Sequence, residues 1–134
     1  MSAHDSLDMI LAALEAAGEP TRLRLLALLA EAELTVSELV TILGQSQPRV
    51  SRHLKLLVEA GLIERHREGS WAFFRAAQDG AAAALARDVI ARLDAADATL
   101  IADKARLAEA RRARAEQARR YFASPAGDWA RPRA

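Results

Sequence analysis

Two short apolar-periodic segments separated by a glycine, between Thr35 and Gly61, constrain the fold of this chain more than any other feature. The first segment opens with Thr35 followed three residues later by Glu38, which is a capping-box pattern, and Gly44 ends it. The second begins near Pro48, where a missing N–H is tolerated in the first helical turn, and ends at Gly61. Two short helices joined by a tight, glycine-containing turn form a helix-turn-helix.

Helices are expected before this motif and a hairpin after it. Apolar residues recur at three and four positions from about 7 to 17, with Ser6 as the expected N-cap, and Pro20 opens a second helix. Beyond Gly61 the apolar period shortens towards two, which predicts strands over 62–67 and 70–75 with Glu68–Gly69 as the turn. A hairpin placed directly after a helix-turn-helix is a wing.

The rest of the chain is predicted to be helical. Neither glycine nor proline interrupts the sequence from Gly80 to Phe122, so we expect one long helix that ends before Ser124–Pro125. The predicted fold is mainly α, a winged helix-turn-helix of order α-α-α-α-β-β-α. Residues 1–80 are expected to form the DNA-binding domain, 81–123 a long C-terminal dimerisation helix and 124–134 a flexible tail.

Charge is distributed unevenly along the chain, although the formal net charge is only +1. Residues 45–75 carry six basic and three acidic side chains, whereas residues 1–44 carry two basic and seven acidic ones. A basic block beside acidic ones is typical of a local polyanion site, with an ordinary solvated surface as the alternative. A second basic run, 111–120, is compatible with a solvated helix end or with an arm that contacts phosphate or a partner protein.

The second helix of the motif presents hydrogen-bond donors beside its apolar face. That face, which must pack on the domain, consists of Val50, Leu54, Leu57 and Val58. Glutamine and arginine can pair with purine edges in a major groove, and serine, lysine and the helix N-terminus suit phosphate oxygens. We expect Gln47, Ser51 and Arg52 to approach bases and Arg49 and Lys55 to hold phosphates. The candidate DNA-binding residues here are Ser46, Gln47, Arg49, Ser51, Arg52, His53 and Lys55.

Apolar stripes on the first and last predicted helices favour self-association. Such a stripe requires another helix, which could be the other terminal helix of the same chain, its copy in a second subunit, or both. The alternative is that the long helix docks a partner protein and that DNA binding is secondary. The candidate dimerisation residues are Leu7, Ile10, Leu11, Leu14, Leu85, Val89, Leu93, Leu100 and Leu107.

Three runs, Gly18–Leu26, Ser46–Leu57 and Ala60–Arg65, resemble the ArsR/SmtB family of winged-helix repressors, and the resemblance covers roughly residues 8–100. It implies a homodimer whose two recognition helices enter successive major grooves of a double-stranded operator, which two-fold symmetry makes an inverted repeat. It also implies that an effector releases the DNA. The wing residues implied near the DNA backbone or minor groove are Arg65, Arg67 and Ser70.

The chain departs from the metal-sensing members of that family. Where they often carry Cys-x-Cys, this chain has Thr35 and Ser37, whose hydroxyls are poor ligands for a thiophilic ion, and the sequence contains no cysteine. The predicted long helix offers aspartates but no histidine, and His4, His53 and His66 lie elsewhere. We therefore expect no metal site, and an organic effector or none.

The stretch from Arg119 to Trp129 resembles segments that link an ArsR-like domain to an S-adenosylmethionine-dependent methyltransferase domain in fused regulators. Because the chain stops at residue 134, no methyl transfer is expected. The resemblance makes S-adenosylhomocysteine, or a related small metabolite, a candidate effector. With no Gly-rich phosphate loop, no nucleophile–base pairing and no apolar run of membrane-spanning length, we expect a cytoplasmic protein that is neither an enzyme nor membrane-bound.

Overall fold

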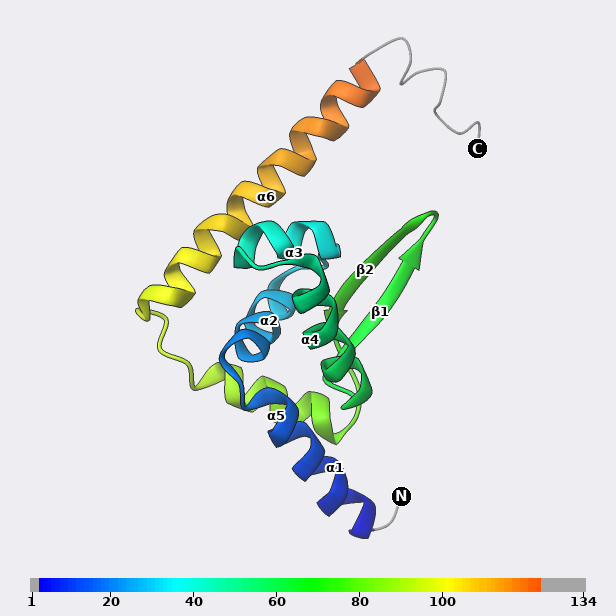
Figure 1. Cartoon of the computed structure of the whole chain (residues 1–134), viewed down its shortest axis with the longest axis vertical. Coiled ribbons are helices and arrows are strands. Elements are labelled where there is room, and N and C mark those ends of the chain that lie inside the picture. The colour runs from blue at the N-terminus through cyan, green and yellow to red at the C-terminus, as the bar shows by residue number, and fades with distance from the viewer. Residues whose placement is uncertain (1–2, 124–134) are drawn as a thin grey trace.

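The computed structural model describes the backbone of residues 3–123 and the side chains of residues 7–123. The described chain is a mainly helical winged helix-turn-helix with a long C-terminal helix, as predicted (Figure 1). Its elements in chain order are α1 Ala3–Ala17, α2 Pro20–Glu31, α3 Val36–Leu43, α4 Gln47–Glu59, β1 Ile63–Glu68, β2 Trp71–Ala76, α5 Ala81–Ala91 and α6 Ala98–Ala123. The predicted tail, 124–134, lies outside the described residues.

The core lies where α2, α3 and α4 meet the base of the wing. Each of these helices contributes leucine or isoleucine side chains from one face, and Leu62 and Ile63, just before and at the start of β1, add two more apolar residues. Burial of this apolar surface is the main force that holds the three helices together. The core residues of the three helices and β1 include Leu25, Leu26, Leu39, Ile42, Leu54, Leu57, Leu62 and Ile63.

The helix-turn-helix has the predicted caps. The backbone N–H of Glu38 donates to Thr35 Oγ1 (3.2 Å), and the backbone N–H of Thr35 donates to Glu38 Oε1 (2.9 Å), which completes the capping box. Gly44 ends α3 in the left-handed conformation, with φ of 66°, which glycine adopts without steric cost. Ser46 is the N-cap of α4. The sequence therefore determines this turn through local chemistry.

The wing is a single antiparallel hairpin, shifted by one residue from the prediction. Glu68 pairs with Trp71, so the turn residues are Gly69 and Ser70 and not Glu68 and Gly69. Gly69 has a φ of 63°, and the first position of a two-residue hairpin turn favours glycine for this reason. At the base of the wing, Leu34 and Phe74 exchange two backbone hydrogen bonds of 3.1 and 2.8 Å.

The first helix begins earlier than predicted. Because α1 starts at Ala3, Ser6 lies inside the helix and is not its N-cap. Neither glycine nor proline stands between Ala3 and Ser6, so nothing in the sequence stops the helix from extending.

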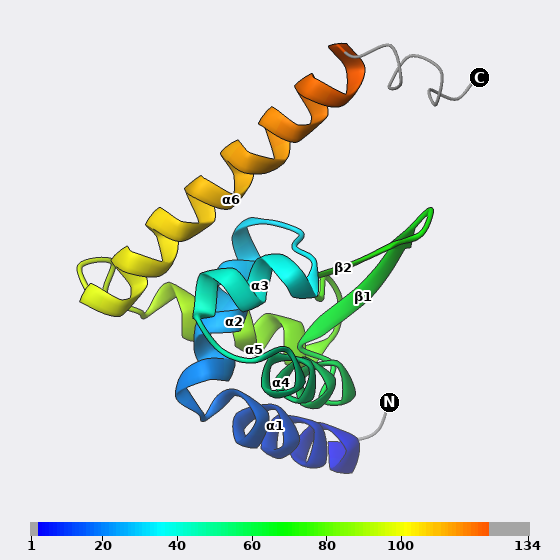
Figure 2. The same ribbon diagram turned by 45° about the horizontal axis from the view of Figure 1, so that its top comes forward.

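The prediction of one uninterrupted C-terminal helix is wrong, because residues 92–97 separate α5 from α6. The Asp94 carboxylate accepts from the backbone N–H of Ala96 (2.9 Å), and the Asp97 carboxylate accepts from those of Thr99 (2.9 Å) and Leu100 (3.1 Å). Such aspartate-to-backbone bonds compete with helix continuation and favour a new N-cap. α6 consequently turns back across α2 and α3, while α5 packs on α1 (Figures 1 and 2).

Candidate nucleic-acid interface

The N-terminal half of α4 exposes most of the predicted donors. The side chains of Gln47, Arg49, Arg52 and Lys55 are exposed, and that of Ser51 is half-buried. On the opposite face Val50, Leu54 and Leu57 are buried as predicted, but Val58 is 37% exposed. The helix therefore packs on the domain through a narrow stripe and leaves a continuous row of hydrogen-bond donors accessible.

A short chain of hydrogen bonds holds Arg49. The Gln45 amide donates to the hydroxyl of buried Thr21 in α2 (3.0 Å) and accepts from Arg49 Nε (3.1 Å). Thr21 and Gln45 were missed by the sequence analysis, because no local spacing connects residues so far apart in the chain. These two residues restrict the conformations of Arg49 before any ligand binds, which lowers the entropic cost of ordering the Arg49 side chain on binding.

The wing places its predicted contacts on the surface. Arg65 and Arg67 are both exposed and, two residues apart in β1, lie on the same face of the hairpin. Ser70 is exposed in the turn. On the other face Glu64 accepts from Arg75 Nε (3.1 Å), so Arg75 is engaged within the sheet.

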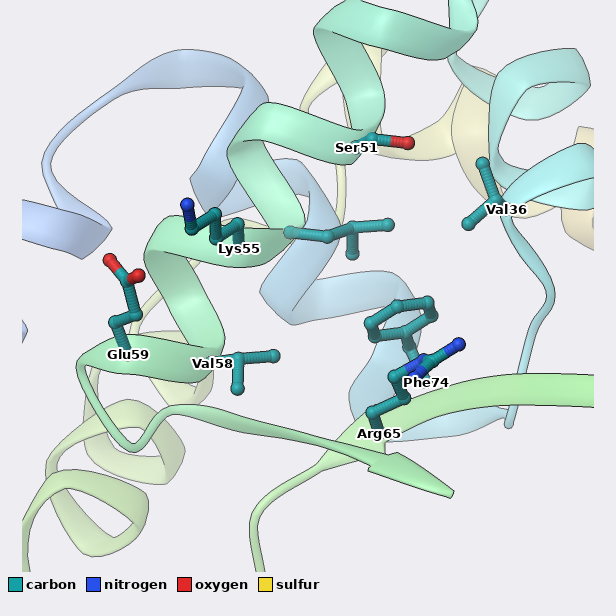
Figure 3. A pocket seen from close by; sticks show the side chains of 8 residues that line it. Val36, Ser51, Lys55, Val58, Glu59, Arg65 and Phe74 are labelled. Atoms are coloured by element: carbon teal, nitrogen blue, oxygen red, sulfur yellow. The ribbon is translucent and has the colours of Figure 1, made fainter. Parts of the chain in front are cut away.

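A groove of 330 Å³ separates the wing from α4 and joins the two sets of candidate residues. Apolar side chains of α3, α4 and β2 line it, and Lys55 of α4 and Arg65 of β1 border it from opposite walls (Figure 3). Because Lys55 and Arg65 border the same groove, the exposed donors of α4 and the cations of the wing lie on one side of the molecule. The lining residues are Val36, Ser51, Leu54, Lys55, Val58, Glu59, Arg65 and Phe74.

His53 is the exception among the predicted surface donors, because it is 6% exposed and faces the domain. It lies three residues after Val50 and four before Leu57, so helical phase puts it on the buried face. Arg22 of α2 approaches its Nδ1 to 3.1 Å, and Glu19 lies 3.9 Å from its Nε2. The assignment of His53 to the DNA-facing surface is therefore wrong.

The neighbours of His53 favour its neutral form. The Arg22 guanidinium can only donate, so Nδ1 accepts and the ring proton is on Nε2. Burial lowers the pKa of His53; Glu19 opposes this shift, and the positive charges of Arg22, Arg49 and Arg52 add to it. Protonation would place a second positive charge against Arg22 in a desolvated site.

The free energy of unfolding is therefore expected to fall as the pH is lowered from about 7.5 to about 5.5. The unfolded chain binds a proton at the ordinary histidine pKa, and the folded chain binds it only at lower pH, so acid favours unfolding. The pKa of Glu19 is also lowered, but that contribution is lost only below about pH 4.5. Urea titrations across this pH range measure the effect.

A His53→Gln variant should lose most of this pH dependence, since glutamine can still accept from Arg22 but does not titrate. His66→Gln in the wing is the matched control and should keep the pH dependence, because it leaves His53 and its neighbours Arg22 and Glu19 in place. An unchanged pH dependence in His53→Gln would contradict the assignment.

The predicted dimerisation residues divide into three groups. On α1, Leu7, Leu11 and Leu14 are 70%, 53% and 48% exposed, which leaves an apolar surface beside α5. Half-buried positions are Ile10, Leu85, Val89, Leu93 and Leu100. Leu107 is 1% exposed and belongs to the core of its own chain, so its assignment to a dimer interface is wrong.

The described part of the chain has neither a cluster of metal-ligating side chains nor a membrane-spanning helix. Among the residues that the structure describes, no three histidine, aspartate or glutamate side chains converge as a metal ion would require. Within 3–123, no helix has both the length and the hydropathy needed to cross a bilayer.

Comparison with known proteins places this architecture among transcription regulators. The protein-family model described as "Bacterial regulatory protein, arsR family" matches residues 19–65, from the start of α2 to β1. The arsenical resistance operon repressor of Escherichia coli is 48% identical over 58 residues, which are 42% of this chain and 50% of the repressor. An uncharacterized HTH-type transcriptional regulator of Methanocaldococcus jannaschii is 39% identical over 66 residues, 48% of this chain and 74% of that protein.

A solved structure shares the same fold. The homodimeric winged helix-turn-helix DNA-binding domain of a possible ArsR-family regulator from Mycobacterium bovis has a TM-score of 0.58 and 31% identity, covering 66% of this chain and 83% of that one. The match to the E. coli repressor spans only half of that protein's length. The family match covers α2, the helix-turn-helix and the first residues of the wing, a range that includes most of the candidate interface.

Proposed function

Because this chain belongs to the ArsR family of bacterial regulatory proteins, we propose that it is a transcriptional repressor that binds double-stranded operator DNA as a homodimer. The observation that supports this most directly is the exposed donor row of α4 beside the cations of the wing. Residues 1–80 provide the DNA-binding unit in this proposal. The regulators to which the chain is similar are not enzymes, and no catalytic activity is proposed.

In this proposal α4 is the recognition helix and lies in the major groove, whose width admits an α-helix. Gln47, Ser51 and Arg52 read base edges near the N-terminal end of α4. Arg49, already held by the hydrogen bond that it donates to Gln45, and Lys55 contact phosphates on either side of the groove. Specificity then comes from the first group and most of the salt-dependent affinity from the second.

The wing supplies further contacts with the backbone or the minor groove through Arg65, Arg67 and Ser70. Ser46 stands at the N-terminus of α4, where its hydroxyl accepts from the backbone N–H of Arg49 (3.4 Å) and the helix dipole favours a phosphate. Lys55 and Arg65 line the same groove, so the contact regions of α4 and the wing are adjacent.

Dimerisation through α1 and α5 places two recognition helices about 34–36 Å apart, one turn of the duplex, and requires an inverted repeat. The exposed leucines of α1 support this interface, as does the homodimeric state named for the M. bovis domain. α6 does not continue α5, so its leucines are not an extension of the same surface.

We further propose that a non-metal effector releases the protein from its operator. Thr35 Oγ1 accepts a capping bond from Glu38, and the chain has no cysteine, so a thiophilic ion has no strong ligand in this stretch. The groove behind the wing and the dimer interface are where an organic ligand could favour a DNA-free arrangement. S-adenosylhomocysteine is the first candidate because of the methyltransferase-linker resemblance of Arg119–Trp129, of which residues 124–129 lie outside the described residues.

Footprinting and fluorescence anisotropy on the DNA upstream of the chain's own gene test the proposed function. A preference over random duplex of about 10³-fold or more at physiological salt is expected of a sequence-specific repressor. Titration of the complex with zinc, arsenite and S-adenosylhomocysteine then tests the effector. Release by micromolar zinc or arsenite would contradict the non-metal proposal.

Substitution of Arg52 and Lys55 should separate specificity from affinity. Arg52→Ala is expected to weaken operator binding by about 1–3 kcal/mol and random-DNA binding much less, since a base contact is lost. Lys55→Ala should weaken both alike and lower the salt dependence by about one unit per subunit. Arg92→Ala, exposed between α5 and α6, is the control and should leave both affinities unchanged. Wild-type operator affinity in Arg52→Ala would exclude Arg52 as a base contact.

A further inference from the structure

α6 contacts α2 and α3 at successive points along its length. Near its start, Asp103 accepts two hydrogen bonds of 2.8 Å from the Arg24 guanidinium of α2. One turn later Leu107 enters the core, and Arg111 donates to the backbone carbonyl of Glu31 (2.7 Å) at the end of α2. These contacts carry the basic part of α6 along the outer side of α3 (Figure 2).

Arg114 makes the last of these contacts and connects three elements with one side chain. Its guanidinium forms an ion pair with Glu38 of α3, including a bond of 2.9 Å to Oε2, and donates to the Glu33 carbonyl (3.2 Å). The same group lies over the ring of Phe73 in β2, 5.4 Å from its centre, within the range of a cation–π contact.

The partners of Arg114 are themselves connected to the wing and to α3. The Glu38 carboxylate also accepts from the backbone N–H of Thr35, so it fixes the first turn of α3. Glu33 lies 3.6 Å from Arg75 of β2, and the next residue, Leu34, pairs with Phe74. Arg114 therefore acts where the loop before α3 and the wing are held together.

On the side that faces α6, few of the described contacts join the wing beyond its base to the rest of the domain. A two-stranded hairpin is marginally stable by itself and depends on packing. A cavity of 320 Å³ lies between α6 and the wing, and Glu33, Glu68, Phe73, Arg111 and Arg114 line it. Trp71, further towards the tip, is 64% exposed. Among the contacts described between α6 and β2, the stacking of Arg114 on Phe73 is the one that spans this space.

We infer that Arg114 is a positioning residue of the DNA-binding site: it holds the wing at a fixed angle to α4 without touching DNA. The inference rests on the proposed function for its consequence, which is that α6 preorganises the wing for binding. The charge of Arg114 is already paired with Glu38, which is mostly buried. A basic residue at this place in the sequence would otherwise be interpreted as a phosphate contact.

Mobility of the wing in the absence of DNA tests the inference directly. The chain has two tryptophans, so a Trp129→Phe background leaves Trp71 as a probe within the wing. Arg114→Ala in this background should increase the amplitude of fast depolarisation of Trp71 in time-resolved anisotropy. Phe73→Leu, which removes the ring but leaves the ion pair, should do the same. Arg114→Lys, which keeps the charge but not the planar stacking, should restore only part of the order.

Operator binding supplies the second readout. Arg114→Ala should bind operator roughly three- to tenfold more weakly than wild type, with an unchanged slope of log affinity against log salt. Arg112→Ala is the matched control, because Arg112 is exposed and pairs with Glu109 within α6 (2.6 Å); it should change neither readout.

Two results would overturn the inference. One is unchanged Trp71 depolarisation in both Arg114→Ala and Phe73→Leu. The other is a salt slope that falls by about one unit per subunit in Arg114→Ala, which marks a phosphate contact. If wild-type protein fails to bind operator, the proposed function is wrong, and the anisotropy measurement on DNA-free protein still decides the role of Arg114.

Discussion

Leu11→Asp is expected to give a folded monomer that binds operator at least about 100-fold more weakly than wild type. Leu11 is 53% exposed on α1, so the substitution leaves the core of the chain intact. In the proposed interface it would bury a carboxylate among leucines without a partner, which disfavours association. A monomer reads one half-site and loses the gain of 10²–10⁴ that the linkage of two sites can give.

Sedimentation velocity measures the oligomeric state, and fluorescence anisotropy measures the operator affinity. Ile101→Asp is the matched control, because Ile101 is also 53% exposed but lies on α6, away from α1 and α5. It should remain dimeric and bind operator as wild type does. A dimeric Leu11→Asp, or a monomeric wild type with tight operator binding, would contradict the proposed interface.

Loss of Arg24 should have the largest effect on folding stability. Asp103 is 2% exposed and accepts two hydrogen bonds from Arg24, whose own pKa is raised by that hydrogen bonding. Arg24→Ala leaves a buried carboxylate for which Arg106, at 3.6 Å, is the one other ion-pair partner among the described residues. Breaking a buried pair in this way costs about 3–5 kcal/mol, and the partial exposure of Arg24 suggests the lower end. Urea unfolding measures the change.

Two further variants make this prediction specific to the buried pair. Replacement of both partners, Arg24→Leu with Asp103→Leu, should recover most of the loss, because no unpaired charge remains. Lys104→Ala removes an exposed contact with Glu31 at 3.9 Å and should change the free energy of unfolding by less than about 0.5 kcal/mol. Equal losses in the double variant and in Arg24→Ala would show that packing, and not the charge, is responsible.

The parts of the fold that the sequence predicted are those whose determinants are local. The capping box of Thr35 and Glu38 and the left-handed Gly44 act within a few residues, so α3, its end and the start of α4 were predicted correctly. The predicted turn of the wing was one residue too early. Glycine fits either position of a two-residue turn, and only the pairing of Glu68 with Trp71 decides between the two registers.

The parts of the fold that the sequence did not predict are those where two local structures compete. Aspartate can lie inside a helix or bind backbone N–H groups where a helix ends or begins. In the structure Asp94 accepts such a bond within the loop, and Asp97 accepts two at the start of α6. The break at residues 92–97 removes Leu93 from the helical phase of Leu107 and lets α6 turn back onto α2 and α3. Leu107 is therefore buried in the core of its own chain and is not part of a dimer interface.

Within the candidate site, the exposure of side chains was predicted correctly where helical phase and polarity agree, as for Arg52 and Lys55. His53 shows where they conflict. Its phase is that of the buried face, and its polarity suggested the surface. The partner that makes burial tolerable, Arg22, lies on another helix and has no signature in the spacing of α4. Long-range partners of this kind need a structure to identify them.

The pairing of Leu34 with Phe74 closes a loop that contains α3, α4 and β1. Closing a flexible loop of that length costs chain entropy, and the cost falls once the enclosed helices have formed and shortened it. α3 and α4 are built from contacts close in sequence, which form fastest. The helix-turn-helix can therefore assemble first, and the base of the wing can close afterwards.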